Sequence, residues 1–141
     1  MKKLLLICFI SLASVQFFSQ KKISVIISNP LSETSLVLLN PKGELQTIKK
    51  APGNCMVVIP KHEQFIVFSG ENNNQKINLN LGIVKADHSN ALTTYALKQD
   101  GIEYSLFILK ESNSLIFFYD LSDDNSWKGF QYDISSLKYH D

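Results

Sequence analysis

The stretch Ile77-Asn78-Leu79-Asn80-Leu81-Gly82-Ile83 decides the fold class of this chain. Its apolar residues occupy every second position, so one face of an extended strand is apolar and the other face is not. This alternation is typical of an antiparallel sheet that has one face on the core and the other in water. The stretch therefore predicts a half-buried strand over residues 77–83.

Further strand-like segments lie on both sides of this stretch and are separated by turn residues. Asp100-Gly101 predicts a tight hairpin, because both of its residues must adopt positive φ. Asn40-Pro41-Lys42-Gly43 predicts a type I turn, and Ala51-Pro52-Gly53-Asn54 predicts a type II turn between two strands. Residues 70–75 are polar and are expected to form a loop. The expected strands are 23–28, 36–39, 45–49, 55–59, 64–69, 77–83, 91–97, 102–109, 115–121 and 127–134.

These strands, about nine or ten in all, recur roughly every ten residues, and no window has convincing helical periodicity. The pattern predicts an all-β fold: an antiparallel β-sandwich, with a closed β-barrel as the alternative. The sandwich is favoured because unequal loops suit two sheets better than an even up-and-down meander. Residues 104–109 and 115–119 are apolar on both faces, so these strands are expected to be covered on both sides. Residues 137–141 are expected to fray.

The N-terminus has the pattern of a secretory signal peptide. Met1-Lys2-Lys3 is a short positive segment, and residues 4–10 form an uninterrupted apolar run. A membrane-spanning helix needs about 20 predominantly apolar residues, and polar residues interrupt this run too early. The order predicts a signal peptide over residues 1–20, cleaved after Ser19 or Gln20, and no stable membrane insertion afterwards.

Removal of the signal peptide leaves a near-neutral chain with one cysteine. The 141 residues include 14 lysines, no arginine and 13 acidic residues, and loss of Lys2 and Lys3 brings the formal charge close to −1. Nucleic-acid binding normally relies on arginine and a net basic surface, so no nucleic-acid partner is expected. Cys55 alone cannot form an internal disulfide, so the core must stabilise the fold. The predicted organisation is a single β-domain over residues 21–141, periplasmic or secreted, as in small bacterial secreted proteins.

The C-terminal aromatic residues and the neighbouring acidic segment are the candidate binding residues. Aromatic side chains on an exposed face can anchor a protein or a carbohydrate, whereas on a covered face they form core. Trp127 is opposite in phase to Phe130 and Tyr132, so one of these faces is either covered or available for binding. The predicted binding residues are Phe118, Trp127, Phe130, Tyr132, Asp120, Asp123 and Asp124.

No metal, cofactor or catalytic residue is predicted. Segment 120–125 offers oxygen ligands to Ca²⁺ but lacks the order of an EF-hand, and acidic turns between strands are usually solvated. His62, His88 and His140 lack the spacing that would place two imidazoles on one face of an element. Cys55 begins an apolar strand, and no neighbour in the sequence lowers its pKa.

The leading interpretation is a non-enzymatic extracytoplasmic β-domain that binds another macromolecule, either a protein or a carbohydrate of the cell envelope. The alternative is a carrier of a small apolar ligand inside a closed barrel, which needs a cavity on the order of 300 Å³ or more. A binding module instead needs a filled core and an exposed patch. A third interpretation is an enzyme centred on Cys55 or His62, whose side chains would have to converge in a cleft.

Overall fold

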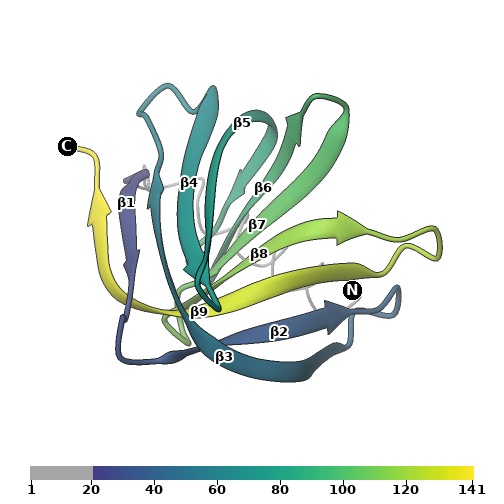
Figure 1. The fold of residues 1–141 in the computed structure, drawn as a ribbon. Helices are drawn as coiled ribbons and strands as arrows, with labels where there is room; N and C mark the ends of the chain where they lie inside the picture. Colours follow the sequence, from purple (N-terminus) through teal and green to yellow (C-terminus); the bar gives the residue numbers. More distant parts are fainter. Residues whose placement is uncertain (1–20) are drawn as a thin grey trace.

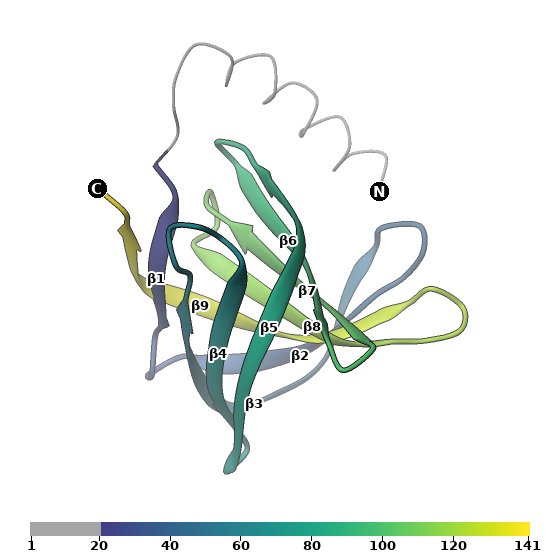
Figure 2. The ribbon, with the colours of Figure 1, turned by 90° about the horizontal axis from the view of Figure 1, so that it is seen from above.

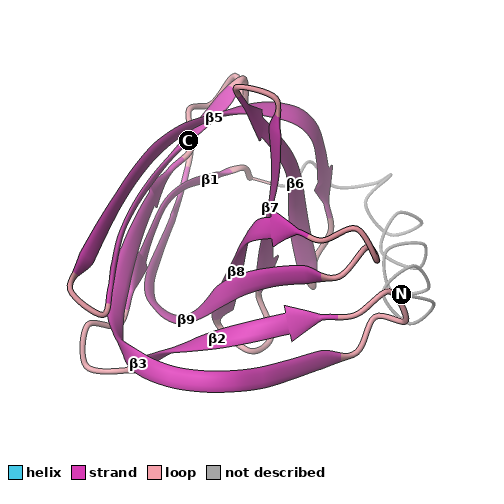
Figure 3. Ribbon diagram, turned by 45° about the vertical axis from the view of Figure 1, so that its right-hand side comes forward, coloured by secondary structure: helices cyan, strands magenta, loops and turns pink. Residues whose placement is uncertain are grey.

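The expected all-β class is confirmed. The computed structural model describes residues 21–141, and the predicted signal peptide over residues 1–20 lies outside the described residues. The described chain forms nine strands and no helix, and so has no helix that could cross a membrane (Figures 1 and 3). The strands are β1 (Ile23–Ser28), β2 (Glu33–Leu39), β3 (Leu45–Val58), β4 (Phe65–Asn72), β5 (Gln75–His88), β6 (Leu92–Gln99), β7 (Ile102–Leu109), β8 (Ser114–Leu121) and β9 (Trp127–Tyr139).

Eight of these strands close into an antiparallel barrel, and β2 is an extra strand in its wall. From β3 to β9 each strand pairs with the next one along the chain, and β1 pairs with both β3 and β9, which closes the ring. Figure 2 shows the sheet curling round so that β1 and β9 lie beside one another. Of the two expected architectures, the alternative is therefore the one observed, and the favoured sandwich does not form.

The reason lies in the two long strands β3 and β9. Their first residues pair with β2 and their last residues pair with β1, so β1 and β2 share one strand position between them. Asn29-Pro30 lies where β1 ends, and Figure 1 shows the chain turning there, with β3 and β9 bending alongside it. Because β3 and β9 run through both parts of the wall, no edge is left at which two separate sheets could end.

One predicted turn is absent. Ala51-Pro52-Gly53-Asn54 was expected to form a type II turn, but it lies inside β3. Pro52 lacks an N–H, and it lies opposite Glu33, the first residue of β2. Its carbonyl oxygen accepts a hydrogen bond from the backbone N–H of Asn73 at 3.0 Å. The turn prediction was wrong because proline is tolerated where a ladder ends.

The other turns largely match their predictions. Asp100 and Gly101 have φ of 51° and 80°, which confirms the hairpin between β6 and β7. The N–H of Gly43 donates to the carbonyl of Asn40 at 2.9 Å, which confirms that turn. The loop expected over residues 70–75 is wrong in extent, because β4 and β5 continue into it. Asn73-Asn74, with φ of 49° and 66°, forms a two-residue turn there, and asparagine adopts this conformation more readily than most residues.

The last residues of the chain are held in place instead of frayed. Tyr139 of β9 pairs with Ile23 of β1. The N–H of His140 donates to the carbonyl of Lys22 at 2.8 Å. The expected fraying of residues 137–141 was wrong because their partner strand is at the other end of the sequence, and this pairing completes the barrel.

The barrel interior is filled with large side chains. All eight strands of the ring contribute buried residues to one apolar cluster. Tyr95, Tyr132, Phe68 and Phe117 are the largest of its fully buried members. Phe68 and Phe117 stack with their ring centroids 4.2 Å apart. An eight-stranded barrel is narrow enough for its own side chains to fill.

A second apolar cluster lies on the outer face of the wall. Its buried members are Val37, Leu39, Ile116 and Phe118, joined by the partly buried Phe107, Leu109 and Trp127. Residues Ser114 to Phe118 of β8 are all buried, which confirms that this strand is covered on both faces. Gly129 of β9 lies opposite Phe118, and a Cβ atom there would be 2.6 Å from the carbonyl oxygen of Phe117.

We expect Gly129→Ala to lower the free energy of unfolding by about 1–3 kcal/mol, because the added methyl group overlaps the backbone of β8. Urea denaturation of the purified protein measures this. Gly82→Ala is the matched control: a Cβ at Gly82 would be 3.4 Å from its nearest neighbour, the carbonyl oxygen of Lys98. It should change stability by less than about 0.5 kcal/mol or increase it. Equal losses in both variants would contradict the close approach of β8 and β9.

Candidate functional site

The predicted aromatic binding residues do not share an exposed surface. Phe118 and Tyr132 are each 1% exposed, and they belong to the outer and the inner cluster respectively. Phe130 is partly buried beside Tyr132, with ring centroids 6.5 Å apart, and Trp127 packs against Phe118 at 6.0 Å. The opposite phases of Trp127 and of Phe130 with Tyr132 are confirmed, and most of this aromatic area lies in the core.

The acidic segment forms the turn between β8 and β9. Asp120 pairs with Lys128 across the two strands, and Asp123 is exposed in the turn. Asp124 accepts hydrogen bonds from the hydroxyl of Ser122 and from the N–H of Ser126, and these bonds hold the pKa of Asp124 below its ordinary value. Within residues 21–141, no three His, Cys, Asp or Glu side chains are placed to hold a metal ion together.

Cys55 and the three histidines do not converge. Cys55 is 4% exposed on β3, and burial raises the pKa of its thiol to about 12 despite a hydrogen bond with Ser28. His62 is exposed, and its Nδ1 accepts the N–H of Gln64 at 3.1 Å. The Nε2 atom of His140 lies 2.7 Å from the carbonyl oxygen of Ile59. His88 contacts Glu63, so each imidazole has a different partner and none of the three contacts Cys55.

A charged cluster around the buried carboxylate of Glu63, which the sequence did not reveal, lies at one end of the barrel. The carboxylate of Glu63, in the turn between β3 and β4, is 2.8 Å from Nε2 of His88 and 3.1 Å from Nζ of Lys22. Burial alone would raise the pKa of Glu63, but the hydrogen bonds and charges of Lys22 and His88 outweigh it and hold the pKa below its ordinary value. Burial, together with the charge of Glu63, raises the pKa of Tyr95.

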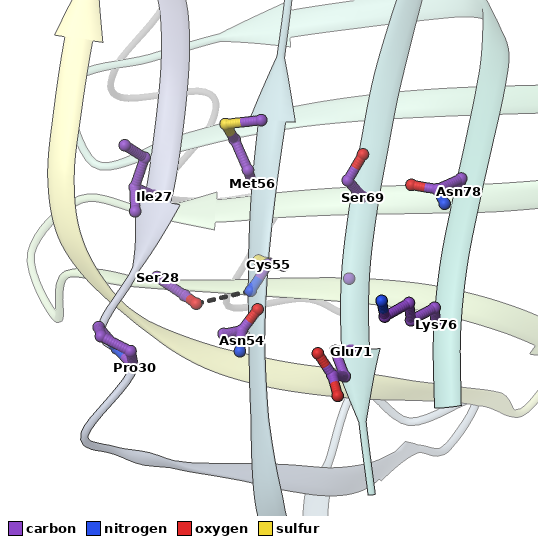
Figure 4. Close-up of a pocket in the computed structure, with 11 residues that line it drawn as sticks. Ile27, Ser28, Pro30, Asn54, Cys55, Met56, Ser69, Glu71, Lys76 and Asn78 are labelled. Carbon is purple, nitrogen blue, oxygen red and sulfur yellow. Dashed lines mark hydrogen bonds between the residues drawn. The ribbon is translucent and has the colours of Figure 1, made fainter. Parts of the chain in front are cut away.

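A groove of about 500 Å³ runs over the outer wall of β1, β3, β4 and β5 (Figure 4). It forms where β1 leaves β3: the pairing of β1 with β3 ends at Ile27 and Met56, whereas its pairing with β9 continues to Ser28 and Ile134. The N–H of Cys55 then donates to the Ser28 hydroxyl at 2.7 Å in place of a β1 carbonyl. The groove is therefore a consequence of the way in which β1 joins the two sides of the barrel.

Two rows of side chains cross the floor of this groove. The first row consists of the cross-strand neighbours Ile27, Met56, Ser69 and Asn78. The second consists of Asn54, Glu71 and Lys76, with Pro30 at its β1 end (Figure 4). The β1 end is apolar, with Ile27 38% and Met56 44% exposed, and the β5 end is polar and carries one charge of each sign.

A second hollow lies at the mouth of the barrel, at the end opposite Glu63 and beside the turn between β4 and β5. This mouth pocket has a volume of about 170 Å³. Its walls are mainly apolar, from Leu36, Ile77, Tyr119 and Phe130, among others. Asn72 also lines it, and Oδ1 of Asn72 accepts a hydrogen bond from the hydroxyl of Tyr132 at 2.7 Å.

Of the residues predicted as a site, Phe130 lines the mouth pocket and none lines the groove. The missed groove residues come from β1, β3, β4 and β5, and no local sequence pattern marks any of them as part of a site. One signal was available: Ile26 and Ile27 are adjacent apolar residues, so one of them had to face outward. In the structure Ile26 is buried and Ile27 lies in the groove.

Comparison of the chain with protein-family models, with curated proteins and with solved structures found no match in any of the three. The function proposed below therefore rests on the geometry of the groove.

We expect the Cys55 thiol of the folded protein to react with iodoacetamide on the order of 10³-fold more slowly than in the urea-unfolded chain. The reason is its raised pKa, which leaves little reactive thiolate near neutral pH. Peptide mass spectrometry at Cys55 measures the rate. Alkylation at the same rate in the folded and the unfolded protein would contradict the burial of the thiol and would support the enzyme interpretation centred on Cys55.

A second expectation concerns stability at acid pH. Because the pKa of Glu63 is lowered in the folded state, its ionised form stabilises the fold above the unfolded-state pKa, and this contribution is lost as the pH falls through the folded-state pKa. Glu63→Gln should therefore reduce stability at neutral pH and flatten its decline between about pH 5 and about pH 3. Urea titrations across this range test it. Glu103→Gln, at an exposed carboxylate of β7, should leave the profile unchanged.

Proposed function

We propose that this chain is an extracytoplasmic, non-enzymatic β-barrel that binds a protein partner through the outer groove of β1, β3, β4 and β5. The observation that carries the proposal is the exposure of Ile27 and Met56 in a concave surface while the barrel interior is filled. A filled core with an exposed patch is what a binding module needs.

The size of the two hollows favours binding at the outer surface. Sites for drug-sized ligands usually have volumes of about 300–1,000 Å³. The groove, at about 500 Å³, falls in this range, and the mouth pocket, at about 170 Å³, does not. The carrier interpretation, in the form that needs a large interior cavity, is therefore less well supported than binding at the groove.

The chemistry of the groove favours protein over carbohydrate. Carbohydrate sites usually present an aromatic ring, and none of the described residues that line the groove is aromatic. Met56 instead offers a flexible, polarisable side chain that adapts to different apolar partners. Leu31 follows Pro30 directly in the chain and is 93% exposed, so a further exposed apolar side chain comes next after the lining residues of β1 and Pro30. A partner segment with apolar side chains at one end and polar ones at the other fits this surface.

The remaining features are consistent with this function. The leader pattern of residues 1–20 supports export, and the near-neutral chain without arginine gives no support for nucleic-acid binding. The high pKa of Cys55 and the separate engagement of the histidines leave the enzyme interpretation without an assembled set of reactive groups among the described residues.

We expect Met56→Glu to reduce capture of the protein partner at least about tenfold, because binding would bury an unpaired carboxylate at a position that a few central contacts dominate. The tagged protein, isolated gently from its own host, is examined by native mass spectrometry. Val84→Glu is the matched control, since Val84 is also an exposed apolar residue, 68% exposed on β5, but does not line the groove.

Urea denaturation should confirm that both variants are folded. A complex that survives Met56→Glu, or that is lost equally in Val84→Glu, would contradict the groove as the binding surface. A bound small molecule with no protein would support the carrier interpretation instead.

A further inference from the structure

A buried polar side chain, that of Asn72, lies in the wall of the mouth pocket. Asn72 ends β4 and is 7% exposed. Its Oδ1 atom is occupied by the hydroxyl of Tyr132, whereas its Nδ2 atom is buried and has no hydrogen-bond partner among the described residues. A buried N–H without an acceptor is costly and uncommon in native structures, so such a group calls for an explanation.

The surrounding chain holds this amide in place. A Cβ atom at Gly53, opposite Asn72 on the neighbouring strand, would collide with Oγ1 of Thr34 and would lie 2.7 Å from Oδ1 of Asn72. Glycine at position 53 therefore leaves the room that the side chains of Thr34 and Asn72 occupy. Because the oxygen of the amide accepts the hydroxyl of Tyr132, its N–H side is the end without a partner among the described residues.

The walls define the size and shape of what could enter. A cavity of roughly 150 Å³ with apolar walls can accept a benzene molecule, and the mouth pocket has about 170 Å³. Tyr119 and Phe130, which line it, stack with ring centroids 5.0 Å apart and an interplanar angle of 19°. A small ring or a short branched chain fits such a space, whereas a long acyl chain does not.

The charge distribution limits the polar group of the ligand. Lys49 is the one charged residue among the described residues that line the pocket, and it is exposed. A carboxylate placed beside Asn72 would lose its water without gaining a counter-ion, which is unfavourable. An uncharged carbonyl oxygen needs only one donor, and the amide of Asn72 has one to offer.

We propose that the mouth pocket binds a small, mainly apolar carbonyl compound whose oxygen accepts a hydrogen bond from Nδ2 of Asn72. This site is separate from the groove, with which it shares no lining residue. Ile77 and Asn78 illustrate the separation, because these neighbours on β5 point to the pocket and to the groove respectively.

Nuclear magnetic resonance with two isosteric probes tests this site. Acetophenone carries an acetyl group on a benzene ring, and in isopropylbenzene a methyl group takes the place of the carbonyl oxygen. With isotope-labelled protein, both probes should shift the methyl signals of Leu36 and Ile77 in a saturable manner. Only acetophenone should also move the side-chain amide protons of Asn72 downfield, because only it supplies an acceptor.

A pair of variants separates binding in the pocket from binding elsewhere. Ala51 lines the pocket, so Ala51→Leu should fill it and weaken acetophenone binding at least about tenfold while leaving the hydrogen-bonding groups untouched. Ala96→Leu places the same change on an exposed site of β6 and should bind acetophenone as the unmodified protein does.

Three results would overturn the proposal. These are no saturable shift with either probe, equal affinity in Ala51→Leu and Ala96→Leu, or the same movement of the Asn72 amide with both probes. None of them bears on the outer groove, whose test is the loss of a protein partner in Met56→Glu, so the two proposals fail independently.

Discussion

The pairing of β9 with β1 and β2 is the constraint on which the rest of the structure depends. A meander from β3 to β9 alone would leave two open edges with unpaired N–H and C=O groups. β1 and β2 fill the space between these edges end to end, and β3 and β9 must bend to follow both of them. This closure confines the large aromatic side chains to one interior and produces the groove where β1 leaves β3.

Because the wall is a single layer, each strand supplies residues to both of its faces. Alternate residues of β3, β4 and β5 line the groove outside or face the barrel interior. The two hollows therefore share their supporting strands but have different chemistry. The groove is open, mixed in polarity and suited to a chain of another protein. The mouth pocket is small and mainly apolar, and the buried amide of Asn72 in its wall has an unused donor.

The candidate site was harder to anticipate from the sequence than the fold. The C-terminal aromatic residues were predicted as binding residues because aromatic side chains are common anchors, yet closure buries Tyr132 in the inner cluster and Phe118 in the outer cluster. The groove residues look ordinary in the sequence, and they become a site only because β1 leaves β3 at Ser28. Similarly, Glu63 contacts Lys22 and His88, which come from other parts of the chain. No local sequence pattern predicts such a cluster.

The sequence by itself determined the all-β class, the Asp100-Gly101 hairpin and the burial of both faces of β8, because alternation and positive φ are properties of a few neighbouring residues. Only the tertiary structure decided that the sheet closes, that Pro52 lies within a strand and that the C-terminus is held. The closure and the held C-terminus depend on pairing between residues on the order of a hundred positions apart, such as Ile23 and Tyr139. The place of Pro52 depends on its pairing with Glu33 of another strand. Local preferences carry no information about such a partner. A barrel and a sandwich are therefore distinguished only by the pairing of β1 with both β3 and β9, which closes the sheet.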